Sequence, residues 1–299
     1  MTDVDELARE YDAQRARMVN VAYAILGSRA EAEDVVADCW PKLVEADRRE
    51  PVRDVAGWLT VAVARTAVDV LRSARVRRET YPGVWLPEPV LTADPLDRVT
   101  LDETVGYALM VVLESLSPAE RTAWVMHDVF GMTFEDVARV VGRSSAAVRQ
   151  LAARARAHLA EGSGRFDVDR SEHERVLGGF LTAAAGGDLE ALVATLDPAV
   201  VLVSDGGGEV SAARRPVEGA SRVARFLLGV AAKNQRELPD ARLELVDVNG
   251  LPSLAVYDGE RLDTVMVLTV ERGRVARVDV IRAPAKLRTV PPNPRTPRR

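Results

Sequence analysis

The sequence predicts a multidomain protein in which two all-α domains are followed by a C-terminal α+β domain. In the first half of the chain, apolar residues recur at the spacing of three to four that is typical of amphipathic helices. A proline-rich stretch at residues 80–96 interrupts this pattern. In the last third, short apolar runs separated by glycine-containing turns indicate strands. The length of 299 residues also exceeds that of a typical single domain.

The composition excludes several classes of protein. The net charge of −5 means that a nucleic-acid site has to be a local basic surface. The single cysteine, Cys39, excludes an internal disulfide and a cysteine-rich zinc site, and we expect it in the core. The N-terminus lacks a signal peptide, and no apolar run approaches the ~20 residues that span a bilayer. We therefore expect a cytoplasmic protein that needs no metal or other cofactor.

Residues 5–79 are expected to form the first helical domain, with helices at 5–26, 30–46 and 54–78. The third helix should bury Trp58, Leu59, Ala62, Thr66 and Val70. Its C-terminal end is basic, with no acidic residue between the arginines. Cations stabilise a helix C-terminus, but the number here exceeds that need and favours a track for phosphates. The arginines of this run are Arg72, Arg75, Arg77 and Arg78, and Arg65, earlier on the helix, is included in the same track.

The helix at 30–46 has an acidic outer side that contains Glu33, Asp34 and Asp38. An acidic helix face is most often simply solvated. The alternative is a docking surface for a basic protein partner, because charge complementarity sets orientation and association rate. Trp40 is close to this face and is either an anchor in such an interface or part of the core.

Residues 80–96 are expected to be a linker. Repeated proline forbids a helix and favours an extended, polyproline-like backbone. Trp85 and Leu86 lie inside this stretch and would not usually be left in water. We therefore expect the linker to pack on another part of the chain.

Residues 97–161 are expected to form the second helical domain, and they contain a helix-turn-helix pattern. Ser117 and Glu120 form a capping box with Pro118 at the first helical position. Further on, Thr133 caps a short helix, Gly142 supplies a tight turn, and Ser144 caps the final helix.

The final helix of this pattern has two contrasting sides. Residues on one side should pack inward: Val148, Leu151, Ala152, Ala155 and Leu159. The other side carries Arg149 and Gln150 between alanines, and these side chains can pair with guanine and adenine edges in a major groove. The candidate DNA contacts are Arg143, Ser144, Ser145, Arg149, Gln150 and Arg154. Periodicity alone is equally consistent with a solvated helical hairpin, and a GC-rich genome would also raise the arginine content.

The ordered set of motifs resembles a known family. It comprises Ala32-Glu33-Asp34-Val35, Gly57-Trp58-Leu59, Leu116-Ser117-Pro118-Ala119-Glu120-Arg121 and Ala146-Ala147-Val148-Arg149. Together these resemble the extracytoplasmic-function (ECF) sigma factors of bacterial RNA polymerase.

The resemblance implies a role for each segment. Residues 31–43 would dock on the clamp helices of the largest polymerase subunit, with contacts from Glu33, Asp34, Asp38 and Trp40. Residues 54–78 would bind and open the −10 promoter element through Trp58 and the basic residues named above. Residues 133–156 would read the −35 element. The implied partners are core polymerase and promoter DNA, and the sequence requires neither a membrane nor a separate anti-sigma factor.

The string Trp85-Leu86-Pro87-Glu88-Pro89 is similar to one in the sigma subgroup that carries a SnoaL-like C-terminal domain. That domain would span residues 171–287, before a disordered tail at 288–299. Helices are expected at 171–185, 188–196 and 219–235. Strands are expected at 200–204, 241–248, 253–257, 262–270 and 274–281, the last four as an antiparallel run in a curved, cone-shaped sheet.

Two further motifs of the subgroup suggest a regulatory role. The loop Asp205-Gly206-Gly207-Gly208-Glu209 resembles one of them. The other is an Asn-Pro-Asp-Lys-Leu string, where this chain has Ala283-Pro284-Ala285-Lys286-Leu287. The regulatory candidates are Trp85, Asp205, Gly206, Gly207, Gly208, Lys286 and Leu287. One hypothesis is that this domain restrains the sigma half by packing across it and the linker.

Two rival interpretations remain open. The first is a helix-turn-helix regulator that binds duplex DNA without polymerase. The second is a bifunctional protein, because related folds host isomerases and cyclases that use a carboxylate base in an apolar cone. The candidates for such chemistry are Asp205, Asp263 and Asp279 as the base and Tyr257 as a proton donor. We expect no catalytic site.

Overall fold

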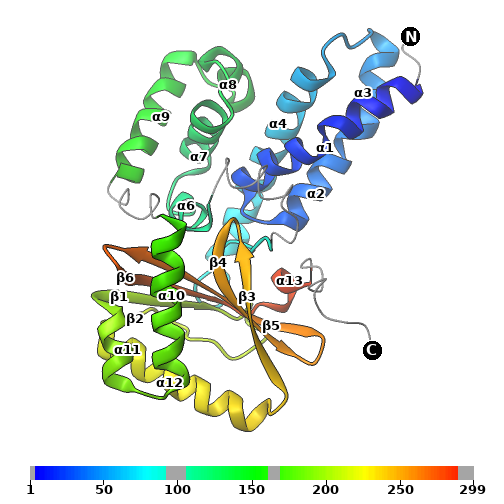
Figure 1. Ribbon diagram of the computed structural model, residues 1–299. Helices are drawn as coiled ribbons and strands as arrows, with labels where there is room; N and C mark the ends of the chain where they lie inside the picture. Colours follow the sequence, from blue (N-terminus) through cyan, green and yellow to red (C-terminus); the bar gives the residue numbers. More distant parts are fainter. Residues whose placement is uncertain (1–3, 92–105, 161–168, 289–299) are drawn as a thin grey trace. The chain divides into compact units, whose positions relative to one another are not determined.

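The computed structural model describes residues 4–91, 106–160 and 169–288, except for the side chains at 75–77 and 79. The chain divides into two compact units (Figure 1). The helical unit contains Met1–Glu79, Glu103–Val105 and Val112–Gly162. The α+β unit contains Thr80–Asp102, Gly106–Val111 and Ser163–Arg299. The proline-rich linker thus belongs to the α+β unit. The first part of the helix expected from residue 97 and most of the tail expected at 288–299 lie outside the described residues.

The N-terminal part of the helical unit contains α1 Val4–Leu26, α2 Arg29–Ala37, α3 Cys39–Arg49 and α4 Val55–Glu79. The prediction of a single helix at 30–46 is wrong, because the helix is interrupted at Asp38, between α2 and α3. Pro41 explains the break. It has no N–H, and its ring would clash with the carbonyl of Ala37 in a continuous helix.

The buried side of α4 differs from the predicted one. Leu59 is fully buried as expected, but the stripe continues through Val63, Ala67 and Leu71 at intervals of four residues. Trp58 and its predicted companions Ala62, Thr66 and Val70 are only half-buried. An aromatic side chain near the surface of α4 is therefore left beside the core rather than within it.

The second part of the helical unit contains α7 Pro118–Trp124, the π-helical turn η1 Val125–Val129, α8 Phe134–Val141 and α9 Ser145–Ala160. The Ser117–Glu120 capping box is confirmed, and the Ser117 hydrogen bonds lower the pKa of Glu120. Gly142 ends α8 in the left-handed conformation with φ of 71°, which glycine adopts without strain. The helix-turn-helix prediction is therefore confirmed, whereas η1 was not anticipated.

The α+β unit is built on one curved sheet with strand order β2-β1-β6-β5-β4-β3 (Figure 1). Its strands are β1 Leu196–Asp205, β2 Val217–Glu218, β3 Ala241–Val248, β4 Leu251–Asp258, β5 Arg261–Glu271 and β6 Arg274–Ile281. Its helices are α6 Tyr107–Leu113, α10 Arg170–Ala185, α11 Leu189–Thr195, α12 Ala220–Glu237 and α13 Pro284–Leu287, and the boundary between the units falls within α6. The antiparallel run β3 to β6 is confirmed, while β1 joins β6 in parallel.

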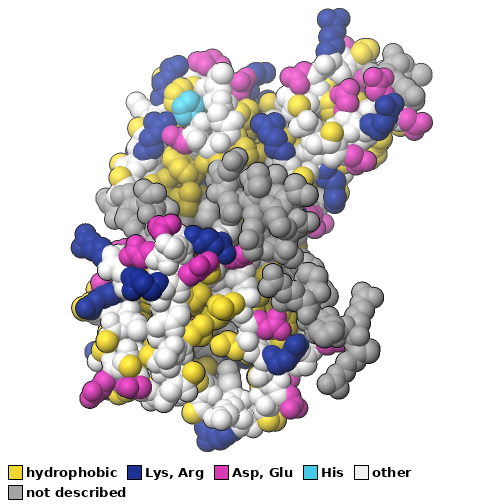
Figure 2. Space-filling model, in the orientation of Figure 1, with side chains coloured by type: hydrophobic (Ala, Val, Ile, Leu, Met, Phe, Trp, Pro, Cys, Tyr) yellow, Lys and Arg dark blue, Asp and Glu magenta, His cyan; other side chains and the backbone are white. Residues whose placement is uncertain are grey.

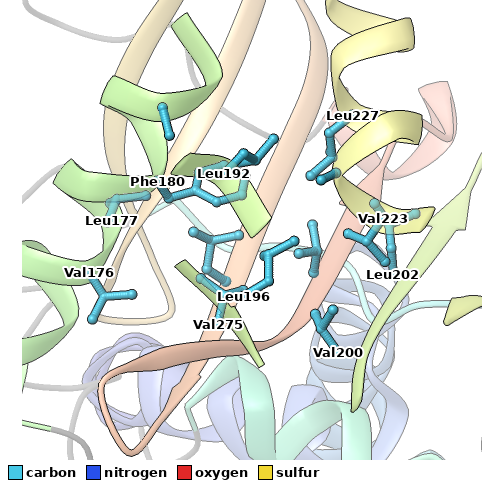
Figure 3. Packing of buried hydrophobic residues seen from close by; sticks show 14 of the residues in the cluster. Val176, Leu177, Phe180, Leu192, Leu196, Val200, Leu202, Val223, Leu227 and Val275 are labelled. Atoms are coloured by element: carbon cyan, nitrogen blue, oxygen red, sulfur yellow. The ribbon is translucent and has the colours of Figure 1, made fainter. Parts of the chain in front are cut away.

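The two faces of this sheet are covered differently. One face packs against α10, α11 and α12 through a purely hydrophobic cluster, seen from close by in Figure 3. The labelled side chains of Phe180, Leu192 and Leu227 point from the three helices towards this cluster. On the other face, Val203, Val265 and Val267 pack with Leu86 of the linker. The expected α+β architecture is therefore present, with the linker as part of its core.

Candidate nucleic-acid interface and linker-binding site

The outer side of α9 is exposed as the sequence predicts. Val148, Leu151, Ala152, Ala155 and Leu159 are buried. Arg149, Gln150 and Arg154 are exposed on the opposite side. Ser144 accepts a hydrogen bond from the Ala147 backbone and so caps α9. The candidate base-reading residues therefore lie together on one accessible helix face.

Most arginines around this face are paired with acidic residues of the same unit. Arg149 lies 3.2 Å from Glu135, and Arg154 lies 3.5 Å from Glu120. Such exposed pairs contribute little stability, so a phosphate or a base can replace the acid. Figure 2 shows the same mixture, with basic and acidic side chains interspersed over the helical unit. Arg143 is exposed and has no ion-pair partner among the described residues.

The basic residues of α4 are in several different environments. Arg72 is exposed and 3.3 Å from Asp69. The Arg65 guanidinium donates to the backbone carbonyl of Arg139 at 3.0 and 3.3 Å. Arg75 and Arg77 have side chains outside the described set. These residues were predicted to form a single phosphate track, but one of them, Arg65, is hydrogen-bonded to the second half of the helical unit.

A buried ionic cluster joins the two halves of the helical unit. Arg78 donates to Glu114 at 2.5 Å and to the carbonyl of Leu26 at 2.7 Å. Arg121, only 1% exposed, also pairs with Glu114 and donates to the carbonyl of Ala24 at 3.0 Å. Sequence reasoning missed Glu114 and Arg121, because a charged residue on an amphipathic helix is ordinarily a surface residue.

The acidic candidates of the first helical region are mostly accessible. Asp34 and Asp38 are exposed, and Glu33 is half-buried beside Arg29 at 2.8 Å. The half-buried Trp40 packs tilted on Tyr11, with ring centroids 5.1 Å apart. Trp40 therefore contributes to packing and still presents an edge next to the acidic face.

Asp205 is the centre of a second site, in the α+β unit. Its carboxylate is 1% exposed and accepts four hydrogen bonds. One oxygen accepts from the Tyr81 hydroxyl at 2.5 Å and the Gly207 amide at 3.0 Å. The other accepts from the Leu86 amide at 2.9 Å and the Lys286 ammonium at 2.6 Å. One buried carboxylate thereby joins the linker to the end of the sheet.

Lys286 completes this site from α13. Its ammonium lies 3.7 Å from the centroid of the Trp85 ring, a cation–π contact, and donates to the carbonyl of Leu86. Burial and the hydrogen bond to Asp205 raise the pKa of Tyr81, which therefore remains a neutral donor. We call Tyr81, Trp85, Leu86, Asp205 and Lys286 the linker clamp.

The three glycines after Asp205 are required by close approach of the backbone. A Cβ on Gly206 would lie 2.4 Å from the carbonyl oxygen of Val210. A Cβ on Gly208, whose φ is 76°, would lie 2.4 Å from a ring carbon of Pro82. At Gly207, with φ of 68°, it would lie 3.1 Å from Ala283. The loop thus brings its backbone against the linker and the segment before α13, while Leu287 is buried on the same face.

The linker is also bound beyond the clamp. Val90 and Asn249 exchange two hydrogen bonds of 2.8 and 3.1 Å, and Leu91 forms a β-bridge with Val248. In the middle of the linker, the carbonyl of Pro87 accepts a hydrogen bond of 3.2 Å from the Tyr107 hydroxyl of α6. The expectation that the extended linker packs on another part of the chain is confirmed.

Three of the four candidates for an enzyme site are engaged in other contacts. Asp205 is fully engaged in the clamp, and Asp279 is buried beside Arg277 on the linker side of the sheet. Asp263 pairs with Arg282 at 3.0 Å. Tyr257 has a buried hydroxyl without a partner among the described atoms. The space between the sheet and its helices, where a base would be expected, is filled by hydrophobic side chains (Figure 3).

The described part of the chain offers neither a metal site nor a membrane-spanning helix. No group of three or more histidine, cysteine, aspartate or glutamate side chains there could hold a metal ion. None of its helices has the length and apolarity needed to cross a membrane.

Comparison with known proteins decides the family. The family model for Sigma-70 region 2 matches residues 11–77, and that for Sigma-70, region 4 matches residues 107–159. The ECF RNA polymerase sigma factor SigJ of Mycobacterium tuberculosis is 39% identical over 292 residues, which cover 93% of this chain and 92% of SigJ. The chain belongs to the ECF sigma factors of the sigma-70 family.

Other relatives agree along the full length of this sigma factor. A second M. tuberculosis protein, named "Probable ECF RNA polymerase sigma factor SigI", is 33% identical over 295 residues, covering 96% of this chain and 97% of its own. The crystal structure of M. tuberculosis SigJ matches with a TM-score of 0.76 at 35% identity, over 95% of this chain and 99% of that one. The likeness therefore includes the α+β unit as well as regions 2 and 4.

The family determines the partners in general terms. Sigma factors bind the RNA polymerase core and promoter DNA. In this sigma factor, region 2 includes α1 to α4, and region 4 includes the helix-turn-helix of α8 and α9. The resemblance stated from the sequence motifs is thus confirmed.

Proposed function

We propose that the α+β unit controls initiation by this sigma factor through its hold on the linker between regions 2 and 4. The supporting observation is the Asp205 carboxylate, which receives two donors from the linker and one from Lys286 while almost fully buried. This segment is the covalent connection between regions 2 and 4, so the α+β unit governs the length of chain available between them. Trp85, Gly206, Gly207, Gly208 and Leu287 act with the linker clamp.

In promoter recognition, Arg149 and Gln150 read base edges of the −35 element. Arg143, Ser144, Ser145 and Arg154 contact its phosphates. In region 2, Trp58 and the arginines Arg65, Arg72, Arg75 and Arg77 bind the −10 element. Arg78, which was predicted with them, is instead held by Glu114 and the carbonyl of Leu26. This division is supported by the exposure of the outer face of α9 and by the half-buried aromatic ring at Trp58. Phosphate contacts supply affinity, whereas base contacts supply sequence preference.

The polymerase contact is formed by Glu33, Asp34, Asp38 and Trp40, which dock on the clamp helices of the largest subunit in the cytoplasm. Regulation by a unit of the same chain requires no separate anti-sigma factor. The exposure of Asp34 and Asp38 supports this assignment, because long-range attraction to a basic partner needs accessible charge.

Run-off transcription with purified core polymerase tests the role of the α+β unit. The full chain, a chain truncated after Arg165 and the Asp205→Asn variant are compared at equal concentration on the same promoter. Release of the linker should change transcript yield in both altered proteins. The control Glu237→Gln removes one negative charge, as Asp205→Asn does, but alters only an exposed pair on α12 and should leave the yield unchanged. If the truncated and full chains behave identically, the proposal fails.

The same run-off assay distinguishes this proposal from the rival regulator, because a regulator that acts without polymerase would not support initiation by the core enzyme. Arg149→Ala should weaken transcription from the cognate promoter more than it weakens binding to random DNA, while a phosphate contact such as Arg72→Ala should lower both and flatten the salt dependence. Equal losses on both kinds of DNA for Arg149→Ala would contradict its assignment as a reader.

A further inference from the structure

An aromatic stack lies next to the recognition helix of region 4. The ring of Phe134, the first residue of α8, stacks on the imidazole of His127 with centroids 3.7 Å apart and planes inclined by 26°. The guanidinium of Arg149 lies over the Phe134 ring, 5.2 Å from its centroid. The three side chains come from three consecutive elements, η1, α8 and α9.

The stack is anchored by the π-helical turn and the loop after it. The Nδ1 atom of His127 lies 2.7 Å from the carbonyl oxygen of Met132. Because a carbonyl only accepts, Nδ1 carries the proton and donates. Val125 and Met126 in the same turn are fully buried. The wider spacing of a π turn therefore fixes the direction of His127 relative to the core, which is a use often found for such turns at functional sites.

We propose that Phe134, supported by His127, is a positioning residue that sets the orientation of the Arg149 guanidinium for base reading. This inference rests on the proposed role of Arg149 at the −35 element. An arginine side chain has many rotamers, whereas a bidentate contact to a base accepts only one plane and one direction. Packing over a ring restricts the plane and leaves the N–H edge available.

Glu135 supplies a second restraint on Arg149. It accepts a hydrogen bond from one terminal nitrogen at 3.2 Å. A guanidinium has five N–H donors, so this contact leaves others for a base. In this proposal neither Phe134 nor His127 contacts the base. Both act through Arg149, and their loss should therefore matter only where Arg149 matters.

A promoter library tests the proposal in the complete holoenzyme. The full chain with core polymerase transcribes barcoded templates that carry a randomised −35 element, and sequencing of transcripts gives the base preference at each position. Arg149→Ala identifies the position that this residue reads. Phe134→Leu should lower the preference at that position by roughly two- to fivefold, the effect of an exposed cation–π contact, and leave the other positions unchanged. Phe134→Tyr retains the ring and should restore the preference.

A double-mutant comparison separates positioning from a structural effect. Phe134→Leu combined with Arg149→Ala should show no loss beyond that of Arg149→Ala alone. His127→Gln keeps an amide donor for the Met132 carbonyl while removing the supporting ring, and should act in the same direction as Phe134→Leu. Phe130→Leu, an aromatic change at a half-buried residue after η1, is the matched control and should alter no preference.

The failures are distinguishable. If Arg149→Ala lowers the base preference at no position of the −35 element, the role of Arg149 as a reader fails, and the positioning role of Phe134 fails with it. If Arg149→Ala flattens one position but Phe134→Leu lowers all positions equally, or adds to the loss in the double variant, only the positioning role is overturned.

Discussion

Replacing Asp205 by asparagine should strongly destabilise the α+β unit. All four partners of the carboxylate are hydrogen-bond donors. Tyr81 and Gly207 donate to one oxygen, and Leu86 and Lys286 donate to the other. An asparagine amide would direct its NH₂ group at donors in either orientation. It would also leave the Lys286 ammonium, in a side chain only 11% exposed, without its ionic partner. Breaking a buried pair from one side costs about 3–5 kcal/mol.

Differential scanning calorimetry of the full chain measures this loss. At about 2–4 °C per kcal/mol for a unit of this size, the transition of the α+β unit should fall by roughly 10 °C. The double variant Asp205→Asn with Lys286→Met removes the unpaired charge, so its loss should be smaller than the sum of the two single losses. The control Glu237→Gln alters an exposed pair with Lys233 and should change stability by less than about 0.5 kcal/mol. A fall of less than about 3 °C for Asp205→Asn, or additive losses, would refute the reasoning.

Three further predictions concern other parts of the chain. Gly208→Ala should destabilise the linker contact by more than Gly259→Ala, because both have positive φ but only the first Cβ meets another residue, a linker proline at 2.4 Å; equal changes in Tm would contradict this. Glu114→Gln should lower the free energy of unfolding of the helical unit in urea by about 3 kcal/mol, since it leaves the buried Arg121 without its carboxylate. Burial lowers the pKa of His173, so its ring stays neutral in the folded protein. As the pH falls below about 6.5, the unfolded chain takes up a proton there and the folded protein does not, so the free energy of unfolding decreases. His173→Gln should flatten the decline of Tm between about pH 7 and pH 5, and an unchanged slope would exclude this source.

Features that depend on residues close in sequence could be predicted well. The capping box at Ser117 and the N-cap at Thr133 join residues three apart, and the buried and exposed sides of α9 follow from a period of 3.6. The exposed face with Arg149 and Gln150 was predicted in this way. Where a local signal was overlooked, as with Pro41 between α2 and α3, the prediction failed, although the necessary information was local.

The linker clamp shows the opposite case. Resemblance indicated the glycine loop and the lysine near the C-terminus, but not what they do. Asp205 binds residues 124, 119 and 81 positions away along the chain. No periodicity connects such residues, and a buried lysine or aspartate has the same letter as an exposed one. The same holds for Arg121 and Glu114, whose burial depends on the packing of α7 against α1 and α4.

By itself, the sequence determined most of the helices and strands, the family, and the exposed face of α9, because caps, turns and amphipathic periods act over a few residues. Only the tertiary structure decided that the linker is part of the α+β core, that Asp205 and Lys286 form one buried pair, and that Phe134 lies under Arg149. These depend on the burial of charges and rings by distant parts of the chain, and burial sets whether a charged group needs a partner.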